Sequence, residues 1–189
     1  MTVNNFSIRE ASLADAGALL EIYSYYVKET AVSFEYEIPS LSEFEERIRE
    51  ISSKFPYIVI EDNKSGRILG YAYAGSFHKR AAYQWCVETT IYLDRDSRRS
   101  GLGRALYDEL EKRLFSMGIL NLNACIAVPD IEDEHLTMDS VRFHEKMGYS
   151  MVGEFHKCGY KFDKWYNMVW MEKLIGEHKS NQKKPEFGN

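Results

Sequence analysis

Apolar residues in the first third of the chain recur with the periods of one strand followed by two helices. Residues 5–11 alternate as expected for a strand. Apolar positions between residues 19 and 27 recur every three or four residues, as on one face of a helix. Ser40 or Ser42 can cap a second helix that extends to about Ser53.

The middle of the chain predicts three strands and a third helix. Segments 57–61 and 67–75 flank the turn sequence N-K-S-G, a pattern typical of a hairpin. A long apolar run over 83–93 predicts the next strand. Residues 102–114 then return to helical spacing.

The last part of the chain predicts a strand at 121–128, a short helix at 140–146 that ends at Met147-Gly148, and strands at 149–155 and 165–172. Helices that alternate with strands in this mixed order favour an α/β (α+β) class. We expect a single domain with a mixed, twisted sheet of about seven strands and about four helices on both faces.

Length and composition limit the possible functions. A chain of 189 residues suggests one domain, which we place at 1–177, followed by a polar tail at 178–189 that we expect to be disordered. The formal charge of -5 and the lack of an extended basic face argue against a nucleic-acid partner. No apolar run or leader suggests a membrane, so we expect a cytoplasmic protein. Three scattered cysteines form neither a disulfide framework nor a metal site.

The sequence R-R-S-G-L-G-R-A at 98–105 reverses the local charge of this acidic chain. It lies between a predicted strand and a predicted helix, where free N–H groups and the helix dipole favour an anion. Gly101 and Gly103 let the backbone approach a ligand closely. The alternative is a solvated glycine turn, because such turns are weakly specific by themselves. The pattern is neither a P-loop nor a dinucleotide fingerprint. Four arginines crowd the turn: Arg95, Arg98, Arg99 and Arg104.

The segment from Arg98 to Gly103, together with the helix that leads to M-G-Y at 147–149, resembles two motifs of the GNAT superfamily of N-acetyltransferases. Four further segments are similar to the phosphinothricin and methionine sulfoximine acetyltransferase group within it. They are Y-A-G-S-F-H-K-R-A-A-Y-Q-W (73–85), V-E-T-T-I-Y-L (87–93), R-F-H-E-K-M-G-Y (142–149) and G-Y-K-F-D-K-W-Y (159–166).

The resemblance implies acetyl-CoA as co-substrate, no metal, and a homodimer. It also implies two strands that splay apart beside a bulge, near residues 92 and 122, with pantetheine between them. The backbone of Thr90, Ile91 and Tyr92 would face the cofactor. Its pyrophosphate would lie on the turn, whose residues are Arg98, Arg99, Ser100, Gly101, Leu102, Gly103 and Arg104.

Amine acetylation needs a base, because an alkylamine is mostly protonated at pH 7. Glu88 lies in an apolar-rich strand, and the resemblance implies that it takes this proton; the alternative is a solvent-facing glutamate. His144 occupies a position where the family often has a tyrosine that could protonate the leaving thiolate. A histidine packed on its helix and bonded to backbone is an equal alternative. Tyr92 and Tyr107 are weaker candidates for that proton donor.

The resemblance places the acceptor near Lys79, Arg80 and Tyr83, and Arg80 could grip an acid group with two hydrogen bonds. Phe34 and Trp165 could form apolar walls, although such aromatics are more often core. We therefore expect direct acetyl transfer to the primary amine of a small amino-acid-like molecule. The alternatives are acetylation of a polyamine, an aminoglycoside or a protein N-terminus, or a non-catalytic acyl-CoA-binding module. The acidic loop at 129–138 could attract a polycation.

Overall fold

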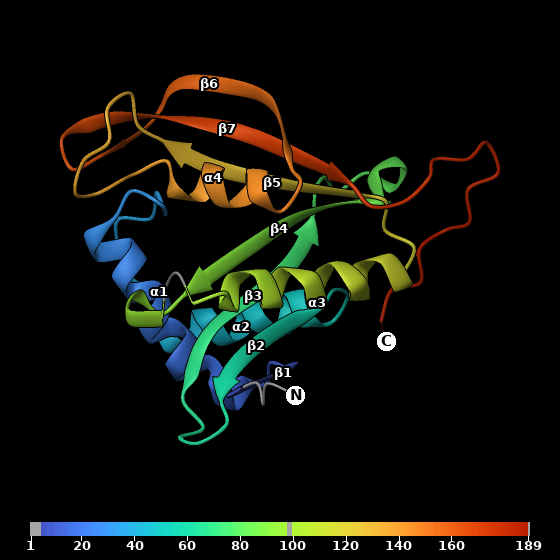
Figure 1. Ribbon diagram of the computed structural model, residues 1–189, viewed down its shortest axis with the longest axis horizontal. Helices are drawn as coiled ribbons and strands as arrows, with labels where there is room; N and C mark the ends of the chain where they lie inside the picture. The colour runs from blue at the N-terminus through green and yellow to red at the C-terminus, as the bar shows by residue number, and fades with distance from the viewer. Residues whose placement is uncertain (1–4, 98–99, 189) are drawn as a thin grey trace.

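The computed structural model describes residues 5–97 and 100–188. They form one seven-stranded sheet with the strand order β1-β2-β3-β4-β5-β7-β6 (Figure 1). The β4–β5 pair is parallel and every other pair is antiparallel, so the expected mixed sheet is confirmed. The strands are β1 (Phe6–Glu10), β2 (Tyr57–Asp62), β3 (Ile68–Ser76), β4 (Cys86–Leu93), β5 (Asn121–Val128), β6 (Ser150–Lys161) and β7 (Lys164–Leu174).

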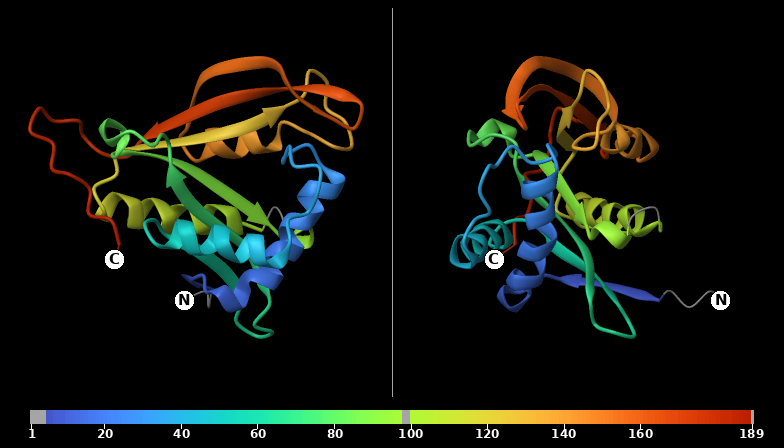
Figure 2. Two further views of the ribbon diagram at one scale, coloured as in Figure 1. Left: turned by 180° about the vertical axis from the view of Figure 1, so that it is seen from behind. Right: turned by 90° about the vertical axis from the view of Figure 1, so that its left-hand side faces the viewer.

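Helices cover both faces of the sheet, as the sequence predicts (right panel of Figure 2). One face carries α1 (Ala16–Glu29) and α2 (Leu41–Ser52), and the other carries α3 (Leu102–Ser116) and α4 (Asp139–Lys146). No helix in the described part of the chain combines the length and the apolarity that a bilayer crossing requires. Short 3-10 turns occur at Leu13–Asp15, Ala81–Tyr83 and Arg95–Ser97.

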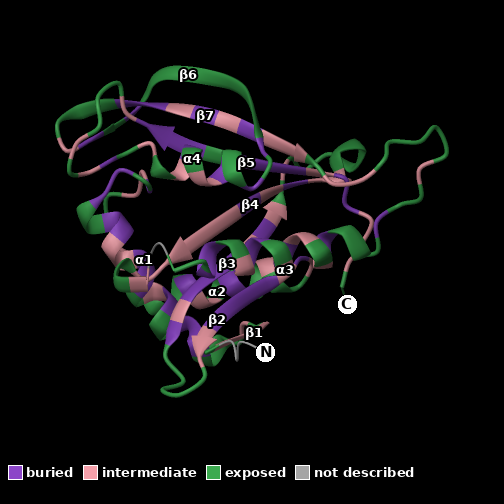
Figure 3. Ribbon diagram, in the orientation of Figure 1, coloured by how far each residue is buried: buried purple, intermediate pink, exposed green. Residues whose placement is uncertain are grey.

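Strand β2 shows why the centre of the sheet reads as a continuous apolar run. Tyr57 and Val59 pack against α1 and α2, whereas Ile58 and Ile60 pack against α3. Successive strand side chains point to opposite faces, and both faces are covered here, so no polar alternation remains. Figure 3 shows the contrast with β6 at the edge, which is exposed along most of its length.

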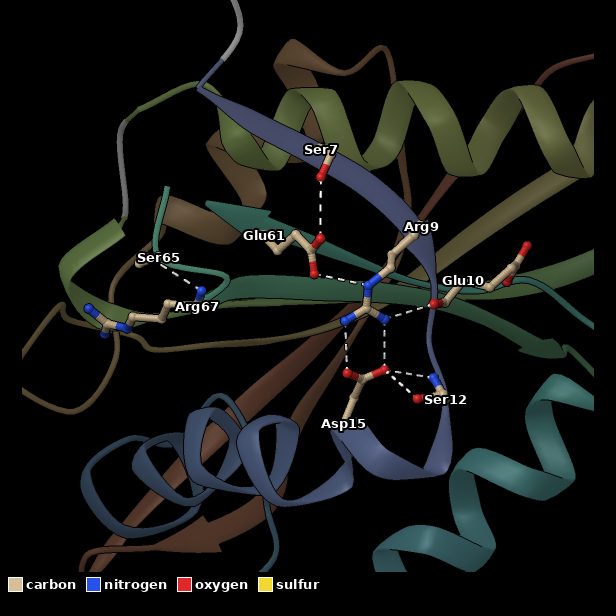
Figure 4. A network of polar contacts seen from close by, with 8 residues as sticks. All are labelled: Ser7, Arg9, Glu10, Ser12, Asp15, Glu61, Ser65 and Arg67. Atoms are coloured by element: carbon tan, nitrogen blue, oxygen red, sulfur yellow. Dashed lines mark hydrogen bonds and ion pairs between the residues drawn. The ribbon is translucent and has the colours of Figure 1, made fainter. Parts of the chain in front are cut away.

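An arginine at the other edge fixes α1 to the sheet. Arg9 on β1 donates from both terminal nitrogens to Asp15 at 2.8 and 2.9 Å, and from Nε to Glu61 at 2.9 Å (Figure 4). The hydrogen bond from Arg9 is the main reason that the pKa of Asp15 falls to about 2. Asp15 also accepts the Ser12 N–H at 2.7 Å, so the start of α1 is held in one orientation.

Strands β4 and β5 pair over three positions only, from Cys86 opposite Asn121 to Glu88 opposite Asn123. Beyond this point β4 follows β3 as far as Leu93, while β5 follows β7, and the two strands diverge (Figure 1). The expected splay is therefore present. The bulge that the resemblance implies is not found in the β3–β4 pair, whose register runs without a shift. The strands separate because each keeps its outer partner.

Two strand boundaries and the C-terminal tail differ from the sequence prediction. Strand β4 begins at Cys86, because Ala81–Tyr83 forms a 3-10 turn, and β6 continues to Lys161. Residues 178–188 of the tail contain no helix or strand, yet they lie against the domain. Trp85 Nε1 donates to Lys183 O at 2.8 Å, and the Phe187 ring packs 5.5 Å from that of Phe55.

Candidate active site

The turn before α3 has the geometry of an anion site. Gly101 is the N-cap residue of α3, with φ at 84°, and a Cβ built there would meet nothing within 4 Å. No side chain caps the helix and its first turn contains no acidic residue. Its first N–H groups therefore face the space beside Gly101. Ser100 and Arg104 are exposed beside them, whereas Arg98 and Arg99 lie outside the described residues.

Gly103 has a different role from Gly101. A Cβ there would lie 3.2 Å from Phe143 Cε2 and 3.4 Å from Leu93 Cδ1. Leu102 is buried beside it. Gly103 therefore allows α3 to pack closely against α4 and β4. Phe143 and Leu93 occupy the space on the Cβ side of Gly103, where the sequence predicts a ligand.

The backbone N–H and C=O groups of β4 point alternately toward β3 and away from it, and this decides which residue faces the opening between β4 and β5. Asp94 N–H donates to Leu69 O at 2.9 Å, so by alternation the backbone groups of Thr90 and Tyr92 face β3. Those of Leu93 and Ile91 face away from β3. The Tyr26 hydroxyl bonds both Leu93 O, at 2.6 Å, and Leu93 N, at 3.3 Å. Of residues 90–92, the backbone of Ile91 therefore faces the opening. The resemblance implies that the backbone of all three faces the cofactor.

Glu88 lies at the last paired position of β4 and β5, half-buried on the face that carries α1. Its neighbour on β3 is Gly75, where a Cβ would meet nothing within 4 Å, so there is open space beside the carboxylate. Within 5–97 and 100–188, no hydrogen bond or ion pair to the Glu88 side chain is found. Desolvation raises its pKa above the ordinary value. Desolvation disfavours the charged form of a carboxylate, and such a group in open space is a candidate for proton transfer.

His144 is buried and fully hydrogen-bonded. Nδ1 lies 2.7 Å from Ser140 O, and Nε2 lies 3.0 Å from the Tyr107 hydroxyl. Because a carbonyl only accepts, Nδ1 carries the proton and Nε2 accepts from Tyr107. Burial lowers the pKa of His144 to about 4, so the ring is neutral at pH 7. These are the contacts of the alternative considered above, a histidine packed on its helix and bonded to backbone.

The residues assigned to the acceptor divide into two places. Tyr83 packs on His78 and lines a cavity of about 460 Å³, together with Asn123 and Glu172. Lys79 and Arg80 are exposed in the same loop, and neither side chain has a hydrogen bond or ion pair to a described residue.

Phe34 lies elsewhere, with its ring 6.4 Å from that of Tyr166. Trp165 is largely exposed on the β6–β7 hairpin and packs on Tyr160. The sequence does not predict the two neighbours of Glu88 across the sheet, Gly75 and Asn123, as parts of the site. A glycine inside the apolar strand 67–75 is the one sequence signal that could have drawn attention to open space there.

Two of the four carboxylates in the acidic loop at 129–138 pair with cations outside it. Asp133 pairs with Lys164 at 2.6 Å, and Glu132 pairs with Arg142 at 2.8 Å. Asp130 accepts a hydrogen bond from the neutral amide of Asn167, and Glu134 is exposed, 3.7 Å from His135. The cationic partners reduce the attraction of the loop for a polycation.

Residues 8–170 match the family model of the Acetyltransferase (GNAT) domain. The chain belongs to the GNAT acetyltransferases. The matched residues include the three-position β4–β5 pairing and the glycine turn before α3.

Individual relatives agree with this membership. A phosphinothricin N-acetyltransferase from Streptomyces viridochromogenes is 32% identical over 88% of this chain and 86% of its own length. An L-methionine sulfoximine/L-methionine sulfone acetyltransferase from Pseudomonas aeruginosa is 28% identical over 88% of this chain and 92% of its own length. The crystal structure of a phosphinothricin acetyltransferase from Sinorhizobium meliloti in complex with AcCoA has a TM-score of 0.84 and 31% identity. It covers 96% of this chain and 93% of its own.

The neutral state of His144 predicts a loss of stability in acid. Its pKa in the folded state is about 4, below the unfolded value near 6.5, so the unfolded chain binds more protons between these limits. His144 should therefore contribute stability above pH 6.5 that is lost as the pH falls toward 4, about 2–3 kcal/mol by pH 4.5. In urea unfolding, the free energy of unfolding of wild type should exceed that of His144→Gln at pH 7. The gap between the two values should shrink as the pH falls to 4.5.

His156 provides a matched control, because its side chain is 75% exposed. His156→Gln should unfold with the pH dependence of the wild type. Parallel stability curves for wild type and His144→Gln would contradict the assignment of a neutral, buried ring.

Proposed function

We propose that this GNAT acetyltransferase transfers the acetyl group of acetyl-CoA to the primary amine of a small amino-acid-like acceptor, of the phosphinothricin or methionine sulfoximine type. The observation that carries the proposal is Glu88, an unpaired and desolvated carboxylate at the point where β4 and β5 separate. A non-catalytic acyl-CoA-binding module would have no use for such a group, which is costly to bury without a role.

The co-substrate site would extend from the glycine turn into the opening between the strands. The pyrophosphate would lie on the α3 N-terminus at Gly101, with the exposed Ser100 and Arg104 beside it. The roles of Arg98 and Arg99 stay predictions. The pantetheine arm would hydrogen-bond the backbone of Ile91. The AcCoA complex of the Sinorhizobium meliloti relative, which shares this fold, supports the choice of co-substrate.

In the proposed reaction Glu88 takes a proton from the acceptor ammonium, directly or through one water. The amine nitrogen then attacks the thioester carbonyl and the C–N bond forms. As the C–S bond breaks and CoA leaves as a thiolate, the nitrogen loses its second proton to solvent, which leaves a neutral amide. The raised pKa of Glu88 suits this role, because a base with a pKa close to the working pH transfers protons most efficiently.

The state of the thiols supports direct attack over a cysteine acyl-enzyme. Cys125, on the same face as Glu88, has its pKa raised to about 12 by desolvation and then by the Glu88 charge. Desolvation also raises the pKa of Cys86. A thiol in this state is a poor nucleophile, since the thiolate is the reactive form. Cys86 and Cys125 are therefore poorly suited to hold an acetyl group, which supports direct attack by the amine in a ternary complex.

The proton for the CoA thiolate is not assigned to a side chain. The role of His144 as its donor stays a prediction, and the hydrogen bonds of the neutral ring favour a structural role. An ordinary thiol has a pKa near 8.5, so solvent can supply this proton.

Lys79 and Arg80 support an acceptor that carries an acid group. Both cations are exposed and have no partner within the described ranges, so they are available to an anion. The guanidinium of Arg80 matches a carboxylate or phosphinate with two parallel hydrogen bonds. A polyamine has less support because two carboxylates of the acidic loop, Glu132 and Asp133, already pair with cations. The cytoplasmic location and the homodimer stay predictions.

Substitution of Gly101 tests the pyrophosphate site. A Cβ in Gly101→Ala enters the space that the phosphate would occupy, so the acetyl-CoA affinity should fall about tenfold, or ~1.4 kcal/mol, by calorimetry. Gly66 has a similar φ of 69° and the same open surroundings. Gly66→Ala therefore matches the backbone strain, and it should leave the affinity unchanged. Equal affinities for the two variants would place the pyrophosphate elsewhere.

Substitution of Glu88 tests the base. Glu88→Gln keeps the shape and removes the basicity, so kcat should fall on the order of 10²-fold while acetyl-CoA affinity is retained. In wild type, kcat/KM should decline on the acid side with a midpoint above the ordinary glutamate pKa, because protonated Glu88 is inactive. Full activity of the variant from pH 6 to 9 would assign proton removal to solvent or another group.

A screen of amines with acetyl-CoA and thiol detection tests the acceptor class, with Arg80→Lys as the diagnostic variant. We expect the best acceptors to be amino acids with a second acid group. Their KM should rise about tenfold in Arg80→Lys, because lysine lacks the bidentate fork. The exposed Arg49→Lys serves as a control, and its KM should be that of wild type. A polyamine or a peptide N-terminus as best acceptor, indifferent to residue 80, would overturn the acceptor assignment alone.

A further inference from the structure

Lys161 is a lysine whose charged end is buried. Its side chain lies on β6, the residue is 4% exposed, and the ammonium donates to three backbone carbonyls. The distances from Nζ are 2.8 Å to Val27 O, 2.8 Å to Thr30 O and 2.6 Å to Ser33 O. A lysine ammonium has three protons, so each one has a carbonyl partner.

These carbonyls belong to the end of α1 and the loop that follows it. A helix leaves its last carbonyls without intrahelical partners, and a positive charge is favoured at this end. Here the helix does not end on a glycine. Its C-cap residue is Thr30, which is extended with φ at -134°. The chain from Val27 to Ser33 instead curves around the Lys161 ammonium.

Two further contacts hold the same loop, residues 30–36, against the same part of β6. The Phe34 ring lies so close to Gly159 that a Cβ there would be 2.3 Å from Phe34 Cε2. The Tyr36 hydroxyl donates to Tyr160 O at 2.5 Å. Figure 1 shows this loop rising from α1 toward the β6–β7 hairpin. Residues 159–161 therefore form a continuous support for the loop.

The supported loop leads back to the face that carries Glu88. Ser33 Oγ is 2.8 Å from the Tyr23 hydroxyl, and the Tyr23 ring packs edge-on against Tyr92, 5.1 Å away. Tyr73, opposite Thr90 on β3, has a pKa that is raised first by desolvation and to a smaller extent by the charge of Glu88. Loop 30–36 is thus joined through aromatic side chains to the β4 segment that contains the proposed base.

We propose that Lys161 is a positioning residue that fixes loop 30–36 as a wall of the acceptor site. This inference rests on the proposed acetyl transfer to a small amine. Among the described residues, neither 100–103 of the turn before α3 nor Ile91 has a hydrogen bond, ion pair or ring contact with 159–161. Acceptor binding therefore depends on Lys161 and acetyl-CoA binding does not. Removal of the ammonium leaves three buried carbonyls without a donor, which is costly enough to displace the loop.

The test compares Lys161→Met with Lys164→Met. Lys164 lies on the same hairpin, but its ammonium is exposed and bonds only Asp133 among the described residues. We expect Lys161→Met to raise the acceptor KM about tenfold, with the acetyl-CoA KM unchanged, and Lys164→Met to leave both constants near wild type. Hydrogen exchange should show faster exchange at 30–36 in Lys161→Met, with strands β1–β4 still protected.

A second variant, Gly159→Ala, retains the ammonium and displaces Phe34, so it keeps the proposal testable should Lys161→Met fail to fold. It should also raise the acceptor KM with the acetyl-CoA KM unchanged. A folded variant with faster exchange at 30–36 and unaltered acceptor KM would overturn the positioning role. Absence of acetylation by wild type in the amine screen would overturn the proposed function instead, and the exchange experiment would still report whether Lys161 holds the loop.

Discussion

The short β4–β5 pairing is the constraint on which the rest of the structure depends. Three paired positions join the two halves of the sheet, and the strands then diverge because β4 stays with β3 and β5 stays with β7. Beyond the last pair, backbone groups of β4 face an opening, since by alternation they cannot reach β3. Glu88 lies at this last pair. The same divergence of the strands therefore provides both the opening between β4 and β5 and the position of the proposed base.

The distribution of charge separates structural groups from candidate functional ones. Arg9 and Asp15 pair at the sheet edge, Asp133 of the acidic loop pairs with Lys164, and the Lys161 ammonium is bonded to three carbonyls. Against this background Glu88 stands out, because its side chain is half-buried and no described residue pairs with it. A desolvated charge without a partner is an indication of function, since it costs stability unless a ligand or a reaction uses it.

Local features of the site could be predicted from the sequence where a single element determines them. The strand-to-helix turn, the apolar strand around Glu88 and the C-cap signal at Gly148 each lie within one element. The roles of single residues are harder to predict where one element packs against another. Gly103 packs against Phe143, His144 is bonded within a buried network, and Tyr83 turns out of the strand into a 3-10 turn. Neighbours that are distant in sequence decide these outcomes, so periodicity alone contains no sign of them.

The sequence by itself determined the order and type of the elements, because hydrophobic periodicity and turn chemistry are local properties. It also determined the candidate base and the glycine turn, through the resemblance of short segments. Only the tertiary structure decided that Gly75 leaves space beside Glu88, that Ile91 faces the opening, and that Lys161 holds the loop after α1. Each of these depends on strand register or on contacts across more than a hundred residues, and such contacts exist only once the whole sheet has assembled.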